Sequence, residues 1–217
     1  MNLRDRRVQY ETAGLDREQL DANPITQWHA WYEQAASAGV AEPNAMTVST
    51  LDQDGAPDSR VVLARGVDQR GFVFYTNFDS AKSRQLTLSP VASAVFAWLD
   101  LHRQVRVRGT VSRVADQESD DYFASRPRGS QIGAWASPQS QVIEDRKFIE
   151  ARIAEVTARF DGQNVPRPPH WGGWCLSPTA IEFWQGRPSR LHDRFVYLLQ
   201  DNSQTKKTSW QIKRLAP

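Results

Sequence analysis

Short stretches in which apolar and polar residues alternate recur along most of this chain. The runs at 46–51, 60–64 and 72–75 have the β-branched and aromatic content of strands. The polar sequence Asp52-Gln53-Asp54-Gly55 after the first run is typical of a turn. Further strands are expected at 91–99, 104–114, 174–184, 195–199 and 210–215. Many short strands joined by turns predict an antiparallel sheet.

Apolar residues at helical spacing interrupt the strands. The clearest helix begins after Asn23, which can cap it, with Pro24 well placed in the first turn and Gly39 at its end. Its apolar face is expected to carry Ile25, Trp28, Tyr32 and Ala35. Shorter or later helices are expected at 80–88, 116–125 and 143–160. The combination predicts an α+β protein built around an antiparallel Greek-key barrel with flanking helices.

Composition and charge narrow the function classes. The 217 residues include 27 basic and 25 acidic side chains, and this net charge of +2 does not favour a nucleic-acid partner. Cys175 is the single cysteine, which excludes an internal disulfide and a thiolate zinc site, and no metal site is expected. No apolar run approaches a membrane span or a signal peptide. We therefore expect a cytoplasmic protein with one domain at 21–217, preceded by a polar, mobile segment at 1–20.

Basic residues near apolar strands are the first candidates for ligand binding, because an unpaired buried charge is costly. Arg60 and Arg65 flank an apolar tetrapeptide, and their odd spacing would turn them to opposite faces of one regular strand. Lys82 falls at the start of a predicted helix, where backbone N–H groups favour a phosphate. Arg126 and Ser130 follow a helix end and could bind another phosphate. A solvated surface or a plain turn is the alternative at each position.

The stretch 181–195 has the densest collection of reactive and charged side chains. Arg190, His192 and Arg194 alternate along it and would form a cationic row beside Trp184. Such a row could hold a planar anionic ligand against an aromatic wall. Metal-ligand spacing, a dinucleotide fingerprint, a P-loop and a Ser-His-Asp order are all absent from the sequence. The chemistry is therefore expected to come from a bound cofactor.

The same stretch resembles the pyridoxamine 5'-phosphate oxidase family. The resemblance is carried by Glu182-Phe183-Trp184-Gln185-Gly186, Arg190-Leu191-His192-Asp193-Arg194 and Arg214-Leu215-Ala216-Pro217. Earlier segments add to it, in the family's order: Glu42-Pro43-Asn44-Ala45-Met46, Phe74-Tyr75-Thr76-Asn77, Ser80-Ala81-Lys82, Arg103-Gln104-Val105-Arg106-Val107, the segment 125–135 and Trp171-Gly172-Gly173. Together they cover residues 7 to 217.

The resemblance implies a homodimeric split barrel with FMN in two clefts between the subunits. It implies an oxidoreductase of vitamin B6 metabolism that converts pyridoxine or pyridoxamine 5'-phosphate to pyridoxal 5'-phosphate, with dioxygen as acceptor and hydrogen peroxide as product. The cofactor contacts it implies, some from the partner subunit, are Arg60, Val61, Val62, Leu63, Ala64, Arg65, Tyr75, Thr76, Ala81, Lys82, Gln104, Gln139, Ser140, Trp184 and Arg194. The substrate contacts it implies are Arg7, Tyr10, Arg65, Tyr122, Arg126, Ser130, Arg190, Leu191 and His192. His192 and Arg194 are the implied catalytic residues, and residues 1–20 would close over the site.

One position departs from the family pattern. Arg65 stands where the family usually has lysine, which keeps the charge and changes its reach and hydrogen-bond geometry. Two alternative functions remain open at this point. One is a related split-barrel flavin oxidase that acts on another ring, such as a phenazine precursor. The other is a protein that binds flavin or pyridoxal phosphate without turnover, which an assay for hydrogen peroxide would distinguish.

Overall fold

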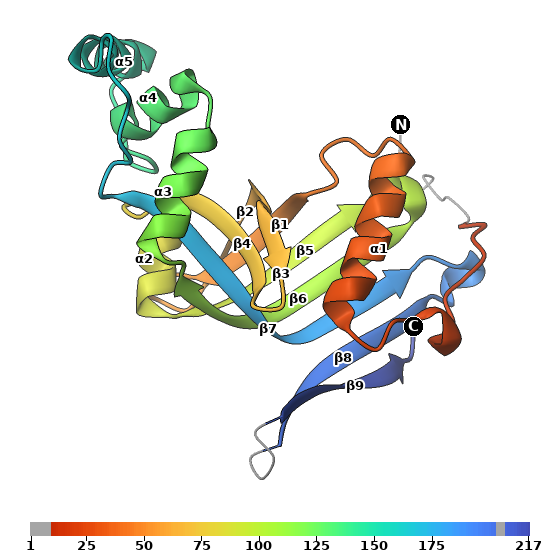
Figure 1. Cartoon of the computed structure of the whole chain (residues 1–217). Helices are drawn as coiled ribbons and strands as arrows, with labels where there is room; N and C mark the ends of the chain where they lie inside the picture. The colour runs from red at the N-terminus through yellow and green to blue at the C-terminus, as the bar shows by residue number, and fades with distance from the viewer. Residues whose placement is uncertain (1–9, 203–206) are drawn as a thin grey trace.

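An antiparallel sheet of nine strands runs through the computed structural model, which describes residues 10–202 and 207–217 (Figure 1). The strands are β1 (Ala45–Leu51), β2 (Pro57–Leu63), β3 (Gly66–Asp68), β4 (Gly71–Asn77), β5 (Val91–Trp98), β6 (Arg103–Arg113), β7 (Trp171–Gln185), β8 (Asp193–Asn202) and β9 (Lys207–Leu215). Their order is β2-β1-β5-β6-β7-β4-β3, and β8 pairs with β7 and β9. The expected α+β architecture on a curled antiparallel sheet is confirmed.

Five α-helices and three short 3-10 helices accompany the described strands. They are η2 (Arg17–Gln19), α1 (Pro24–Ser37), α2 (Ala81–Leu88), η3 (Leu99–Leu101), α3 (Asp116–Ser125), α4 (Arg128–Ala136), α5 (Arg146–Arg159) and η4 (Pro188–Arg190). The expected positions of α1, α2, α3 and α5 are confirmed within a few residues. Helix α4 and the short strand β3 were not expected, since the residues around Arg128 had the composition of a turn.

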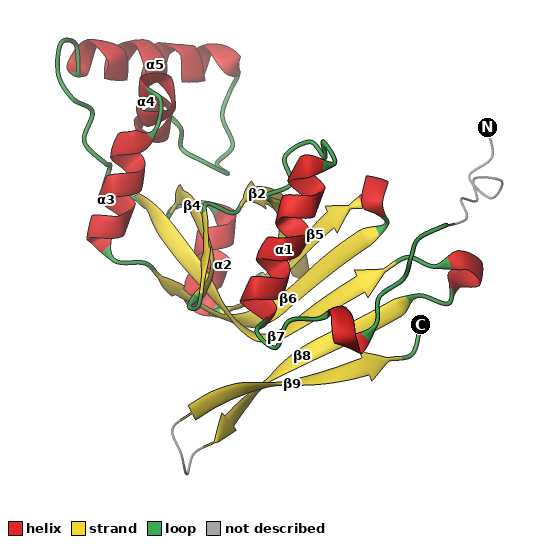
Figure 2. Ribbon diagram, turned by 45° about the vertical axis from the view of Figure 1, so that its right-hand side comes forward, coloured by secondary structure: helices red, strands yellow, loops and turns green. Residues whose placement is uncertain are grey.

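Helix α1 begins and ends as its sequence predicts. The Asn23 side chain accepts a hydrogen bond from the Ile25 N–H at 2.9 Å, and Gly39 follows the helix with a φ of +77°. The buried face packs on the sheet, where Trp28 contacts the rings of Phe72 and Phe96. Burial of this aromatic face fixes the helix across one side of the sheet, as Figure 2 shows.

A second, smaller core lies under helices α3, α4 and α5, which project from the end of the sheet where β4 and β7 pair (Figures 1 and 2). It contains Phe123, Ile132, Ala136, Val156, Phe160, Val165 and Trp171. Arg128 contributes to this packing by donating to the backbone oxygens of Phe160 and Gln163 at 2.6 and 2.8 Å. It therefore stabilises the end of α5 and does not face the cavity described below.

The described part of the N-terminal segment packs as part of the domain. Leu15 and Leu20 are buried in the main core, and Tyr197 Oη donates to the Asp21 carbonyl oxygen at 2.7 Å. The movement expected of residues 1–20 stays a prediction. In the described ranges no helix is long and apolar enough to cross a membrane, and no cluster of acidic, histidine or cysteine side chains could hold a metal ion.

Candidate active site

A cavity of about 750 Å³ lies where strands β2, β4 and β7 meet helices α2, α3 and α4. Eleven of the residues expected from the sequence line it: Val61, Val62, Leu63, Arg65, Tyr75, Thr76, Lys82, Tyr122, Arg126, Ser130 and Gln139. We call these residues the cavity group. Seven further lining residues had no expected role: Asn77, Ser125, Pro127, Gly133, Ala134, Ser137 and Trp171. Most of them fall within the motifs that carry the family resemblance, so membership of these motifs was the sequence feature that could have identified them.

The cavity contains cationic groups whose contacts do not neutralise them. Lys82 is 9% exposed, and its Nζ lies 3.1 Å from Thr76 Oγ1 and 3.4 Å from Gln139 Oε1, which are neutral acceptors. Burial, with Arg60 nearby, lowers the pKa of Lys82. Uncompensated positive charge in a partly buried cavity favours an anionic ligand.

Arg126 provides a second cationic position. Its Nη1 is buried and has no hydrogen-bond partner among the described residues, and its guanidinium lies 4.6 Å from the centre of the Trp171 ring. Burial lowers the pKa of Arg126, and Arg65 adds to the effect. A buried guanidinium N–H without an acceptor is costly, so a ligand oxygen at this position would be stabilising.

Stacked aromatic rings form one wall of the cavity. The Tyr75 and Tyr122 rings lie 4.0 Å apart at 19°, and the Tyr75 and Trp171 rings lie 5.5 Å apart at 10°. Burial raises the pKa of Tyr75 to about 12, so its hydroxyl stays protonated at neutral pH. Flat rings beside cationic groups suit a ligand that combines an aromatic ring with a phosphate.

Arg60 differs from the sequence expectation, because it does not line the cavity. Its Nη1 donates to Thr50 Oγ1 at 2.6 Å, its Nη2 donates to Gln85 Oε1 at 3.2 Å, and it forms an ion pair with Asp58. The idea that Arg60 and Arg65 occupy opposite faces of one strand is also wrong, since β2 ends at Leu63. Ala64, Ala81 and Ser140 also lie outside the lining, although each adjoins a residue that belongs to it.

The remaining expected site residues gather on another part of the sheet. Gln104, Trp184 and Arg194 are paired in register across β6, β7 and β8, so they form one row over three strands. The Trp184 ring lies 4.5 Å from that of His192, and Tyr10 lies 5.9 Å from His192. We call these five residues the ring group. None of them lines the cavity.

His102 lies beside the ring group, although no role was expected for it from the sequence. Its ring stacks on that of Tyr10 with the centres 4.1 Å apart. It sits in the left-handed region, with a φ of +52°, at the turn between β5 and β6. Arg190 and Leu191 are exposed beside the group, and Arg7 lies outside the described residues. The expected substrate contacts are therefore divided between two parts of one chain.

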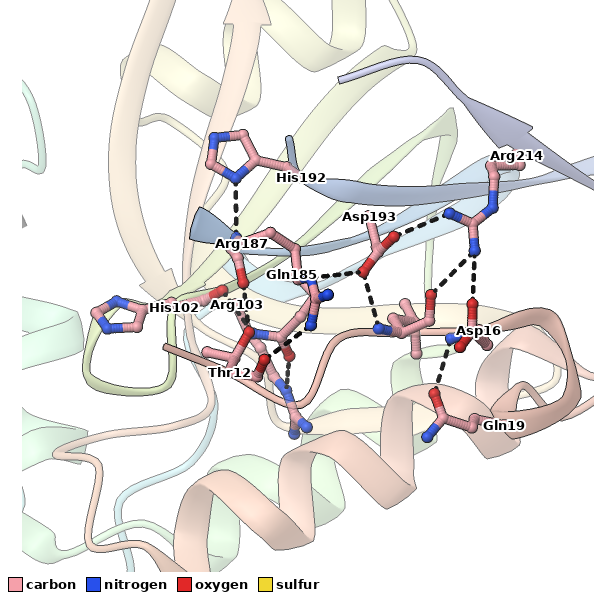
Figure 3. A network of polar contacts seen from close by, with 12 residues as sticks. Thr12, Asp16, Gln19, His102, Arg103, Gln185, Arg187, His192, Asp193 and Arg214 are labelled. Carbon is pink, nitrogen blue, oxygen red and sulfur yellow. Dashed lines mark hydrogen bonds and ion pairs between the residues drawn. The ribbon is translucent and has the colours of Figure 1, made fainter. Parts of the chain in front are cut away.

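Hydrogen bonds fix His192 and Arg194 of the ring group. The backbone N–H of Arg187 donates to His192 Nδ1 at 3.1 Å, which leaves the ring proton on Nε2 (Figure 3). Burial lowers the pKa of His192, and Arg190 and Arg194 add to this, so the ring is neutral at pH 7. Arg194 is held by Glu182, to which its Nε donates at 2.9 Å.

Comparison with known proteins identifies the family of this chain. Residues 32–160 match the family model described as pyridoxamine 5'-phosphate oxidase, and residues 171–217 match the pyridoxine 5'-phosphate oxidase C-terminal dimerisation region. A protein of Burkholderia thailandensis named pyridoxine/pyridoxamine 5'-phosphate oxidase is 53% identical over 215 residues, which is 99% of each chain. A protein of the same name from Burkholderia mallei is also 53% identical over 99% of each chain.

Solved structures share the fold. PhzG from Burkholderia lata, in complex with tetrahydrophenazine-1-carboxylic acid, superposes with a TM-score of 0.87 at 30% identity and covers 97% of this chain and 100% of its own. A pyridoxamine 5'-phosphate oxidase-related, FMN-binding protein from Nostoc punctiforme has a TM-score of 0.68 at 15% identity, with 88% and 97% covered, and supports the fold alone. The extent of the family match and the 53% identity of its relatives show that this chain belongs to the pyridoxamine 5'-phosphate oxidase family.

Proposed function

We propose that this protein is an FMN-dependent oxidase that converts pyridoxine 5'-phosphate and pyridoxamine 5'-phosphate to pyridoxal 5'-phosphate, with dioxygen as acceptor and hydrogen peroxide as product. The observation that carries the proposal is the cavity with cationic residues Lys82, Arg65 and Arg126 beside stacked aromatic rings. Relatives at 53% identity bear the corresponding name. Two separate cationic positions suit two phosphorylated ligands, a cofactor and a substrate.

The residues present fit FMN. The cavity volume of about 750 Å³ is in the range that holds cofactors, and the Lys82 amine lines it and donates to the neutral acceptors Thr76 Oγ1 and Gln139 Oε1. Lys82, Thr76 and Gln139 would hold the cofactor phosphate. FMN, when bound, would supply the hydride-accepting ring that these side chains lack.

The substrate phosphate is assigned to the other end of the cavity group. Arg126 offers its unpartnered Nη1, and Tyr122, Ser130 and Arg65 line the same cavity. Holding the phosphates of cofactor and substrate at separate points would fix the distance between their rings, which is the main contribution of binding to rate in such a reaction. His192 would then present a neutral Nε2–H, and Arg194 a positive charge, to the substrate ring.

The division of the site residues supports a homodimer. The ring group lies outside the cavity of its own chain, and residues 171–217 match a region described as a dimerisation region. In the proposed assembly the ring group of one subunit covers the cavity of its partner. Each of the two sites is then complete only in the dimer, and residues 1–20 would close over it.

The test is production of hydrogen peroxide by the purified, FMN-loaded protein. We expect peroxide and pyridoxal 5'-phosphate with both B6 phosphates, and anaerobic bleaching of the flavin absorption by either substrate. A reduced phenazine precursor is the comparison substrate, because PhzG has the same fold at 30% identity. Turnover of that compound alone would replace the proposal with the phenazine alternative. If the protein binds flavin but neither B6 phosphate bleaches the flavin absorption, the result would favour the alternative of a binding protein without turnover.

A further inference from the structure

The carboxylate of Asp193 lies between two arginines and the N-terminal segment (Figure 3). Its Oδ2 accepts from the Leu15 N–H at 3.0 Å and forms an ion pair with Arg187 Nε at 3.5 Å. Its Oδ1 accepts from Arg214 Nη1 at 2.9 Å. The side chain is 15% exposed, so these contacts replace most of its hydration. Three segments far apart in sequence meet at this one carboxylate.

Both arginines extend this contact along the N-terminal segment. Arg187 Nη1 donates to the Thr12 carbonyl oxygen at 2.8 Å, and Arg214 Nη2 donates to Asp16 Oδ1 at 2.9 Å. Gly14 lies in the same segment with a φ of +86°, and a Cβ there would lie 2.5 Å from Arg187 Nη1. The positive φ favours glycine at this position, and a side chain there would displace the Arg187 guanidinium from its present place.

Arg187 and Asp193 also bracket the loop that presents His192. Between them, Ser189 and Arg190 have φ values of +56° and +65°, a conformation that is strained for residues with a side chain. Such a loop keeps its shape only where surrounding contacts determine it. The Arg187–Asp193 ion pair closes the loop, and the Arg187 N–H fixes the His192 ring.

We propose that Asp193 is a positioning residue that holds the His192 loop and the N-terminal segment 10–16 together as one unit. Its negative charge orients Arg187, whose backbone fixes His192 and whose guanidinium holds Thr12. The Tyr10 ring thereby stays beside His192. The consequence for substrate rests on the proposed function, whereas the coupling itself concerns only this chain's own residues.

The experiment compares Asp193→Asn with the unaltered full-length protein by hydrogen exchange and by NMR of the histidine ring nitrogens. The amide retains the shape of the carboxylate and removes the charge that strengthens its hydrogen bonds with Leu15 and Arg214 and its ion pair with Arg187. We expect exchange of the amides at 12–16 to become about tenfold faster or more. We also expect the His192 Nδ1 signal to move from that of an unprotonated acceptor toward a mixture of tautomers.

A matched carboxylate provides the control. Asp68 also accepts from an arginine, at 2.8 Å from Arg70 Nη2, but it lies in β3. Asp68→Asn should change neither readout. Because both readouts use the protein without substrate, they remain decisive if the oxidase assay fails. With an active enzyme, Asp193→Asn should raise KM for the phosphorylated substrate about tenfold while changing kcat less.

A second pair of variants tests the coupling between the His192 loop and segment 10–16 by changing a residue of that segment. Gly14→Ala would push against Arg187, whereas Gly55→Ala, at a similar φ of +79°, meets no atom within 4 Å. We expect Gly14→Ala to reproduce both changes and Gly55→Ala to produce neither. If Asp193→Asn does not fold, the Gly14→Ala result tests the proposal in its place. Unchanged exchange at 12–16, or faster exchange with an unchanged His192 signal, would overturn the proposal.

Discussion

Nε of Arg194 on β8 donates to Oε1 of Glu182 on β7 at 2.9 Å, and Arg106 Nη1 donates to the other oxygen at 3.1 Å. Glu182 is 8% exposed. The substitution Glu182→Gln removes its negative charge and leaves the two arginines without their carboxylate partner. We expect a loss of about 1–3 kcal/mol in the free energy of unfolding, measured with urea. Glu150→Gln, which removes the exposed partner of Arg146, should cost less than about 0.5 kcal/mol. Equal losses of unfolding free energy in the two variants would contradict the role of Glu182 as a buried partner of Arg194 and Arg106.

Lys82→Ala should weaken FMN binding by roughly ten- to hundredfold, the scale of one charge-assisted phosphate contact. Arg60→Ala, predicted from the sequence to do the same, should have the smaller effect, because Arg60 is bonded to Thr50 and Gln85 and lies outside the cavity lining. Flavin fluorescence titration measures both affinities. The control is Lys147→Ala on the exposed face of α5. A folded Lys82 variant with unaltered affinity would show that this amine does not bind the cofactor.

Arg65→Lys should retain most activity, since lysine keeps the charge at the cavity wall. Arg65→Ala should raise KM for the phosphorylated substrate about tenfold or more, and change FMN affinity much less. Steady-state kinetics and flavin titration on the same preparations separate the two effects. Release of FMN with an unchanged KM would place Arg65 at the cofactor phosphate.

His192 should titrate below its usual value of 6.5, because burial and the neighbouring Arg190 and Arg194 lower its pKa. Between that lowered pKa and 6.5 the unfolded chain binds a proton that the folded chain resists. The free energy of unfolding should therefore fall as the pH falls through this window. His192→Gln should remove that part of the pH dependence. NMR titration of the His192 ring is the direct measurement. A midpoint at or above 6.5 would refute the prediction that the folded protein lowers the pKa of His192.

FMN occupancy and dimerisation should be coupled, because a ligand that binds only the assembled site stabilises the assembly. We expect FMN to shift the protein toward the dimer over a dilution series followed by sedimentation. The apo protein is the reference. A monomer that holds a full complement of FMN would show that the cavity group is sufficient and that the ring group acts elsewhere.

The sequence by itself determined most of the local elements and the family. Asn23, Pro24 and the following apolar spacing are enough to place α1, since capping and amphipathicity are properties of neighbouring residues. Alternation of apolar and polar residues located the longer strands, because this pattern is also a property of neighbouring residues. The motifs at 74–77, 80–82 and 182–194 indicated a flavin oxidase before any contact was known.

Only the tertiary structure decided which charged residues share a cavity. Arg60 and Lys82 look equivalent in sequence, yet contacts with Thr50 and Gln85 direct the Arg60 donors away from the lining while Lys82 faces it. The turn-like residues at Arg128–Ala136 form a helix because burial of Ile132 and Ala136 against α5 outweighs their weak local propensity. The separation of His192 from the cavity depends on strand register, which pairs residues far apart in the chain and has no local signature.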